Sequence, residues 1–210
     1  MKGKIFKSCF ALIVIVSLII TGFVLQSFRY KTKSVIGNTI SDFTLLNVNG
    51  KGISLKEYQK AKGFIIVFTC NHCPFAKLYT NRLNDLNTKF KALDVPLLAV
   101  NSMDTVIYED ESFDKMQQRV KSEKFNFPYL HDAKQTVGKN FGADHTPQAY
   151  VIWKENNEWK IKYSGAIDNN GEEPQKADPF IANAVNELLK NKKVTNPLTQ
   201  SVGCKIFYRK

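Results

Sequence analysis

The hydrophobic pattern of the chain centres on a continuous apolar run at residues 64–68, which is followed within two positions by the first of two cysteines. An unbroken run of β-branched and aromatic residues of this length predicts a strand that is buried on both faces. Pro74 directly follows the second cysteine and fits the first turn of a helix, where its missing N–H is no loss. The pattern therefore predicts a buried strand that delivers Cys70 and Cys73 to the start of a helix.

Downstream of this strand, the apolar positions switch between helical and strand spacing. Apolar residues recur at helical spacing over residues 75–90 and predict one amphipathic helix whose apolar face joins the core. Strands and helices then alternate, which predicts a parallel sheet covered by helices with an antiparallel hairpin beside it. We expect the tail after residue 189 to be irregular. The other expected elements are strands at 43–48, 53–55, 95–100, 147–153 and 159–164, a short segment at 129–132, and helices near 57 and at 112–124, 136–141 and 179–189.

Residues 1–35 differ in character from the rest of the chain. Three lysines precede an apolar stretch at residues 9–28, and three basic residues follow it. About twenty apolar residues can cross a bilayer as a helix, and no small-x-small cleavage site is evident. We expect an uncleaved membrane anchor, with a cleaved secretion signal as the alternative. The amino-terminal lysines favour a globular domain, residues 36–210, on the extracytoplasmic (periplasmic) side.

The charge of the chain does not indicate a nucleic-acid partner. The formal net charge is +11, but six of the basic residues and none of the acids lie in residues 1–35. The modest surplus that is left to the rest of the chain is interleaved with acids, as on a solvated surface.

The two central cysteines form a C-x-x-C pair, and the chain has two more cysteines, Cys9 and Cys204. A structural zinc site needs a second pair or a following histidine pair, and neither is present, so we expect no metal. A static disulfide across so short a loop gains little stability. Free backbone N–H groups at a helix start stabilise a thiolate, so we expect redox use of the pair and a lowered pKa for Cys70.

The order of elements resembles the thioredoxin fold, over residues 36–190. The leading segment from Ile36 to Phe43 and the longer insert after the second strand of the parallel pair are similar to the redoxin branch, which peroxiredoxin-like and membrane-tethered thioredoxin proteins share. Cys70-Asn71-His72-Cys73 stands at the family's active-site position, and Thr146-Pro147 stands where the family has its cis-proline. The resemblance implies a thioredoxin-like α/β fold.

The resemblance also implies roles for residues. Cys70 becomes the attacking thiol and Cys73 the resolving thiol, while Thr146 and Pro147 face the disulfide and receive substrate. Departures from the family are Thr69 and Asn71-His72 in place of Trp and Gly-Pro, and Phe64 in place of a buried carboxylate on the central strand.

Without that carboxylate, protons must be handled by other groups. His72 lies between the cysteines and is a candidate that would favour the thiolate, the alternative being a solvent-exposed loop residue. His145 precedes Thr146 and is a second candidate to face the sulfurs. Cys204 lies in the tail, and we expect it to be dispensable for exchange because a lone cysteine is more often a small buried residue.

These observations favour a membrane-tethered thiol-disulfide oxidoreductase that needs no cofactor. Its partners are protein or small-molecule thiols and disulfides, together with a redox partner that recharges the pair. A peroxidase is the alternative enzyme, but Val67 and Gly63 stand where peroxiredoxins have a hydroxyl residue and a proline. A redox-inert binding module on the membrane is the third possibility.

Overall fold

The computed structural model describes residues 34–210, in which Val35–Lys210 form one compact unit. The expected anchor at residues 9–28 lies outside the described residues. Within the described part of the chain, no helix is both long and apolar enough to cross a membrane.

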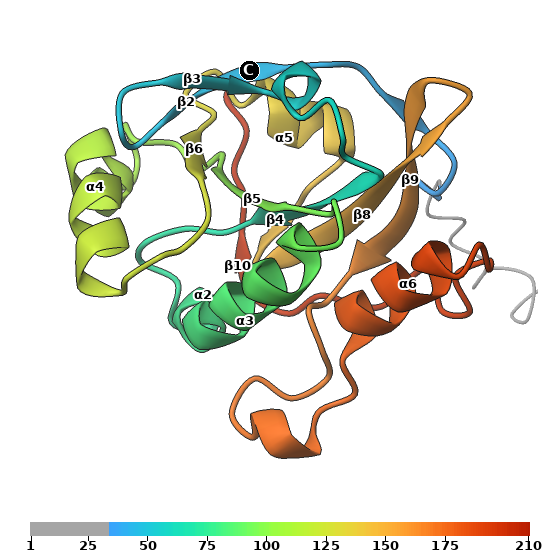
Figure 1. Ribbon diagram of the computed structural model, residues 1–210. Coiled ribbons are helices and arrows are strands. Elements are labelled where there is room, and N and C mark those ends of the chain that lie inside the picture. Colours follow the sequence, from blue (N-terminus) through green and yellow to red (C-terminus); the bar gives the residue numbers. More distant parts are fainter. Residues whose placement is uncertain (1–33) are drawn as a thin grey trace, which may run out of the picture. The chain divides into compact units, whose positions relative to one another are not determined.

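A mixed sheet runs through the described unit, with helices on both faces (Figure 1). Its central strand β4 (Gly63–Phe68) is buried at every residue. It pairs in parallel with β5 (Leu97–Asn101) and antiparallel with β8 (Gln148–Glu155). The strand order is β1-β9-β8-β4-β5-β6-β2-β3, and the remaining strands are β1 (Thr39–Ile40), β2 (Thr44–Asn47), β3 (Gly52–Ser54), β6 (Tyr129–His131) and β9 (Glu158–Gly165). The parallel β4-β5-β6 core with an antiparallel β8-β9 hairpin beside it confirms the expected α/β architecture.

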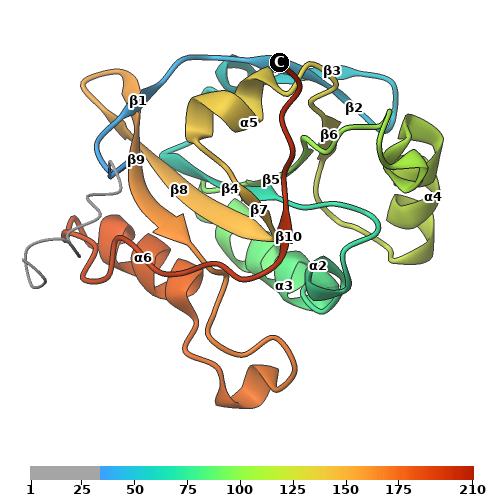
Figure 2. The same ribbon diagram turned by 180° about the vertical axis from the view of Figure 1, so that it is seen from behind.

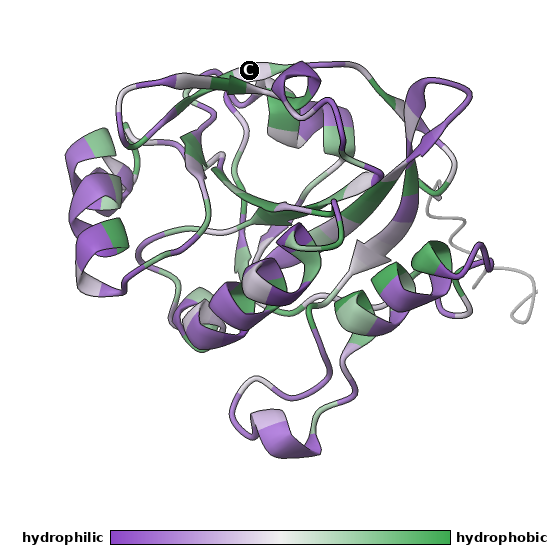
Figure 3. Cartoon of the chain, viewed as in Figure 1, coloured by the Kyte–Doolittle hydropathy of each residue, from purple (hydrophilic) through white to green (hydrophobic). Residues whose placement is uncertain are grey.

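The helices divide the core into two layers, one on each face of the sheet. Helices α3 (Thr80–Lys91) and α6 (Phe180–Leu189) pack on one face, and α5 (Thr136–Phe141) lies on the other (Figure 1). Helix α4 (Phe113–Ser122) adds Met116 to the α3 and α6 layer. The green strands of Figure 3 show how hydrophobic residues concentrate in the middle of the sheet. Three short 3-10 helices complete the described part, at Leu55–Glu57, Glu109–Glu111 and Pro174–Lys176.

The predicted single helix after the cysteines is wrong. The chain forms two separate helices, α2 (Pro74–Lys77) and α3, so the segment is not one continuous helix. Leu83 and Phe90 of α3 are buried as expected, whereas Phe75 and Leu78 are each 45% exposed. The break thus turns two expected core residues towards the surface beside the cysteines.

The prediction that the tail is irregular is also wrong at Cys204–Lys205, which form a strand. Strand β10 (Cys204–Lys205) pairs antiparallel with β7 (His145–Thr146), and Cys204 lies opposite Thr146. Figure 2 shows the tail crossing the end of β7 on its way to the carboxyl terminus. Ile206 is buried, and its N–H donates to the carbonyl of Asp144 over 2.8 Å. The tail is therefore an ordered part of the fold that lies over the cysteine loop.

Candidate active site

The structure brings together the two cysteines and the Thr146-Pro147 segment that the sequence singles out. Cys70 follows the end of β4, and Cys73 caps the start of α2. Both are free thiols with no exposed surface. The peptide bond between Thr146 and Pro147 is cis, as the resemblance implies.

The sulfurs and Thr146 form a closed set of hydrogen bonds. Sγ of Cys70 lies 2.9 Å from Oγ1 of Thr146. The Cys70 thiol also bonds to the Cys73 sulfur, and the Cys73 thiol donates to the carbonyl oxygen of Thr146 over 3.1 Å. Two sulfurs in mutual contact are placed to form and break a disulfide with little movement.

The thiol pKa values correct one expectation from the sequence. The pKa of Cys70 is raised, first because its thiol donates to Cys73, then because it is buried and faces the Glu111 carboxylate. The pKa of Cys73 is lowered, chiefly because its thiolate accepts that hydrogen bond, with further help from Cys204 and from the N–H of Ala76. A lowered pKa at Cys70 was expected from the helix start, but those donors serve Cys73 instead.

A buried carboxylate, Glu111, organises the loop between the cysteines. It has no exposed surface and accepts the backbone N–H groups of Asn71 (2.8 and 2.9 Å) and His72 (2.8 Å). Its oxygens also bond Nδ1 of His72 (2.6 Å) and Nδ2 of Asn101 (2.7 Å). Backbone and side-chain donors together offset the cost of burying this charge.

Further side chains fix the same loop. The Asn71 side chain donates to the carbonyl of Asp110 over 2.7 Å and accepts from the Tyr129 hydroxyl over 3.0 Å. Arg119 is 6% exposed and donates to the carbonyl oxygen of Cys70. Burial raises the pKa of Tyr129, which keeps its hydroxyl a donor. The loop is thus held from three separate elements.

Of the two candidate histidines, the structure brings only His72 close to a sulfur. The His72 ring is paired with Glu111 and stacks on Tyr108, with ring centroids 4.6 Å apart. His145 bonds its neighbour Asp144 through Nδ1 over 2.9 Å. Because side chains alternate along a strand, His145 points to the face of β7 opposite Thr146.

Three groups at the site could geometrically bind a cation. One ligand atom each from Cys70, His72 and Glu111 lies within 4.8 Å of the others. The Glu111 oxygens already accept several hydrogen bonds, and a metal would have to displace some of them. The donor set fits a hydrogen-bonded loop better than a metal centre.

The third described cysteine, Cys204, also reaches the site. Strand pairing sets Cys204 opposite Thr146, whose carbonyl accepts from the Cys73 thiol, and the neighbouring Cys204 helps to lower the pKa of Cys73. Desolvation and the contact with Cys73 raise the pKa of Cys204 to about 11. No local sequence pattern predicts this contact, because Cys73 and Cys204 are separated by more than a hundred residues.

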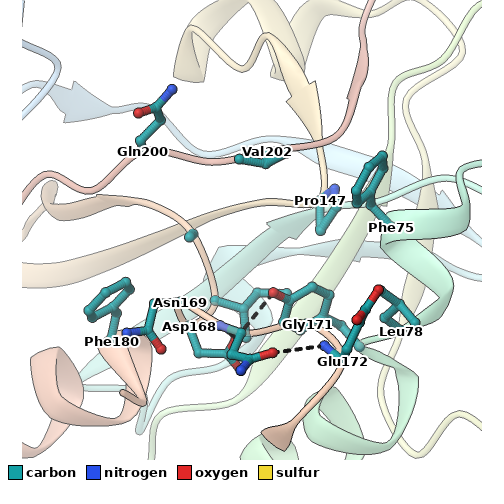
Figure 4. Close-up of a pocket in the computed structure, with 14 residues that line it drawn as sticks. Phe75, Leu78, Pro147, Asp168, Asn169, Gly171, Glu172, Phe180, Gln200 and Val202 are labelled. Atoms are coloured by element: carbon teal, nitrogen blue, oxygen red, sulfur yellow. Dashed lines mark hydrogen bonds between the residues drawn. The ribbon is translucent and has the colours of Figure 1, made fainter. Parts of the chain in front are cut away.

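An open cavity of about 490 Å³ lies beside the cysteine loop, next to Pro147 (Figure 4). Phe75 and Leu78 from the α2 segment line one side, and Val202 of the tail lines another. Asp168 forms part of its polar wall and pairs with Arg82. The cavity therefore offers apolar surface to a partner next to the cis-proline.

Sequence reasoning missed Glu111 and Arg119. Both lie about forty to fifty residues beyond Cys70, in the insert after β5, and no local pattern links them to the cysteines. The only available signal was the absence of a carboxylate at Phe64, which required a substitute somewhere else. The structure supplies that substitute from the 3-10 helix at Glu109–Glu111.

The fold and the dithiol site define a thiol-redox protein with a thioredoxin-like fold. The chain belongs to the AhpC/TSA family, whose model matches residues 36–163.

Solved structures agree with this assignment. The chain is similar to a hypothetical protein from Sinorhizobium meliloti 1021 (28% identity, TM-score 0.76, 85% of this chain and 97% of that chain). It is also similar to an uncharacterized conserved protein from Geobacillus kaustophilus (29% identity, TM-score 0.74, 84% of this chain and 94% of that chain). An exposed lipoprotein thioredoxin from Streptococcus pneumoniae shares the fold (19% identity, TM-score 0.54, 72% of this chain and 99% of that chain). Among curated proteins, none matches.

Proposed function

We propose that this protein is a thiol-disulfide oxidoreductase that uses Cys70 and Cys73 as its redox pair. The observation that carries the proposal is that both buried sulfurs meet at Thr146, whose hydroxyl contacts Sγ of Cys70 and whose carbonyl accepts from Cys73, beside the cis Thr146-Pro147 bond. Membership of a thiol-redox family supports the same class of chemistry.

In the proposed reaction, Cys70 attacks a partner disulfide and forms a mixed disulfide. The hydrogen bond to Cys73 gives the proton of Cys70 a direct route to the Cys73 thiolate during the attack. The first partner sulfur leaves as a thiolate and takes a proton from solvent. Cys73 then attacks Sγ of Cys70 and gives up its proton to the second partner sulfur, which leaves as a thiol. The partner gains two electrons and two protons, and the Cys70–Cys73 disulfide remains.

The reverse reaction, in which an oxidised pair accepts electrons from a partner dithiol, uses the same contacts. The reduction potential and the recharging partner decide the direction. The proposal needs no cofactor. We further propose that the 9–28 segment tethers the protein to a membrane with the redox domain in an extracytoplasmic, oxidising compartment.

A peroxidase is the competing function, and membership of the AhpC/TSA family is compatible with it. Peroxidase chemistry begins with oxidation of one thiolate to a sulfenic acid. Val67 offers no hydroxyl to orient a peroxide, although the Thr146 hydroxyl contacts Cys70 from the other side. The missing hydroxyl at Val67 therefore argues against a rapid reaction with peroxide.

Stopped-flow kinetics on the reduced protein separates the two enzymes. We expect fast exchange with a model disulfide, oxidised glutathione, and slow reaction with hydrogen peroxide. Cys70→Ser is the matched control and should abolish both signals. A peroxide reaction faster than disulfide exchange would show that the proposal is wrong. A pair that stays oxidised in mild reductant would indicate the redox-inert module.

A further inference from the structure

The tail that covers the site brings a third sulfur into the dithiol. Cys73 is hydrogen bonded to Cys70 on one side and to Cys204 on the other, so it is the central sulfur of the three. Neither sulfur of the pair is exposed, whereas Cys204 is partly exposed. Of the three described cysteines, Cys204 is therefore the least buried.

The position of Cys204 is enforced by the backbone around it. Strand pairing places Cys204 opposite Thr146, whose carbonyl oxygen also accepts from Cys73. At Gly203, an added Cβ would lie 2.0 Å from that same carbonyl oxygen, so only glycine permits this approach. On the other side, the Ile206 N–H donates to Asp144. The thiol is thus held between two fixed points.

More distant contacts fasten the tail at both ends. The Tyr208 hydroxyl donates to the carbonyl of Ala143 over 2.5 Å, and Arg209 pairs with Asp104 over 3.5 Å. Upstream, the Thr199 N–H donates to the Ser164 carbonyl over 3.1 Å. A segment tied down in this way presents its cysteine in one place, which lowers the entropic cost of reaction with Cys73.

We propose that Cys204 is a third redox residue, which exchanges with the Cys70–Cys73 disulfide at Cys73. The inference rests on the proposed function, since an outside disulfide must first oxidise the pair. The Cys204 thiolate attacks Sγ of Cys73, the Cys70–Cys73 bond breaks, and Cys70 leaves as a thiolate that takes up the proton lost by Cys204. No electrons are gained or lost, and the disulfide moves to Cys73–Cys204.

This transfer gives the buried disulfide a route to the surface. An outside thiol can attack the partly exposed Cys204, while Cys70 is already reduced for the next partner. The pKa of Cys204 is raised in part by the neighbouring Cys73 thiolate, and that contribution disappears once Cys73 is in a disulfide. Oxidation of the pair therefore removes one of the causes that keep Cys204 protonated. This revises the expectation that Cys204 is dispensable.

The sequence allows a direct test by peptide mapping. Trypsin cuts after lysine and arginine, so Cys70 and Cys73 share the peptide 63–77 and Cys204 lies in the peptide 194–205. The full chain, with Cys9→Ser in every variant, is oxidised with one equivalent of oxidised glutathione and quenched with N-ethylmaleimide. It is then digested without reductant. We expect a cross-linked 63–77/194–205 peptide in which fragmentation finds the alkylated cysteine at Cys70.

Two variants complete the test. Cys70→Ser should lose the cross-linked peptide, because an outside disulfide must first oxidise the pair through Cys70. The combined Cys204→Ser and Lys205→Cys variant moves the thiol to the opposite face of β10 and should lose the cross-link. Equal cross-linking from position 205 would overturn the inference, since any mobile tail could then react.

The outcomes also separate this inference from the proposed function. An internal disulfide within 63–77 together with a fully alkylated Cys204 would overturn the role of Cys204 and leave the oxidoreductase intact. Absence of both disulfides after oxidation would overturn both.

Discussion

At the scale of single residues, the site depends on how charges surround Cys70. The Glu111 carboxylate raises the pKa of Cys70, because a nearby negative charge disfavours a thiolate. The same carboxylate accepts the N–H groups that shape the loop. Glu111 therefore fixes the geometry of the nucleophile and at the same time restrains its reactivity.

We predict that Glu111→Gln lowers the pKa of Cys70. The change removes the charge and keeps an amide oxygen as an acceptor for the loop. The measurement is the rate of iodoacetamide alkylation against pH, in a background where Cys70 is the only cysteine. The midpoint should move to lower pH than in the Glu111 parent. Glu109→Gln, two residues away, is the control and should leave it unchanged. A midpoint that stays or rises in Glu111→Gln would contradict the assignment.

How much of the site was predictable differs from residue to residue. Cys70, Cys73 and Pro147 were predictable, because a C-x-x-C after a buried strand and a Thr-Pro before another are local patterns. Glu111 was not, because its role arises from tertiary contacts across about forty residues. Which of the two thiols has the lower pKa was also not predictable from the sequence. It depends on which sulfur the backbone donors face.

At the scale of elements, β10 decides whether the dithiol is covered. Gly203 lies against the Thr146 carbonyl and Pro147, so β10 can pair with β7 only while position 203 lacks a side chain. Periodicity could not reveal a two-residue strand in a tail of mixed polarity. Its existence depends on a partner strand nearly sixty residues earlier.

We predict that Gly203→Ala uncovers the pair. The overlap of a methyl group with backbone costs on the order of 2 kcal/mol, which shifts the covered population by roughly 30-fold. Alkylation of Cys70 and Cys73 in the reduced protein should accelerate accordingly. Val202→Ala, at a 62% exposed neighbour, is the control and should change little. Unchanged alkylation in Gly203→Ala would mean that the tail does not protect the sulfurs.

The central strand illustrates the opposite case, in which the pattern alone predicts the element. Its apolar run indicated a strand buried on both faces, and β4 is buried throughout. Phe64, at the position where the resemblance to thioredoxins implies a carboxylate, packs edge-on against Tyr58 and Trp159 at centroid distances of 5.3 and 5.0 Å. Position 64 therefore serves packing in this protein.

We predict that Phe64→Ala lowers the free energy of unfolding by about 3–5 kcal/mol, because a cavity replaces a fully buried ring. Urea denaturation measures this change. Phe75→Ala is a matched control at a half-exposed phenylalanine, where we expect roughly 1 kcal/mol or less. Similar losses at both positions would contradict the assignment of Phe64 to the core.

At the scale of the whole molecule, the expected order of strands and helices is confirmed from β2 to α6, apart from the break between α2 and α3. Val35–Lys210 form one compact unit, and the expected division of the chain at residue 35 stays a prediction. The membrane anchor lies outside the described residues and stays a prediction.

We predict that residues 34–210 fold without the preceding segment, because both core layers are made within this unit. Cooperative urea unfolding of the truncated chain, with native circular dichroism, is the expected result. Aggregation with loss of that signal would contradict a separable anchor. In cells, a reporter enzyme fused after Lys210 should be active only outside the cytoplasm.

The central claim is that Cys70 and Cys73 carry out disulfide exchange, and mass spectrometry of the full-length Cys73→Ser variant tests it most directly. This variant keeps the attacking thiol but cannot resolve the mixed disulfide. After incubation with oxidised glutathione, we predict a stable glutathione adduct at Cys70. In a parallel sample with hydrogen peroxide, we predict little sulfenic or sulfinic acid at Cys70 over the same time. Rapid oxidation by peroxide without a glutathione adduct would contradict the account and identify a peroxidase.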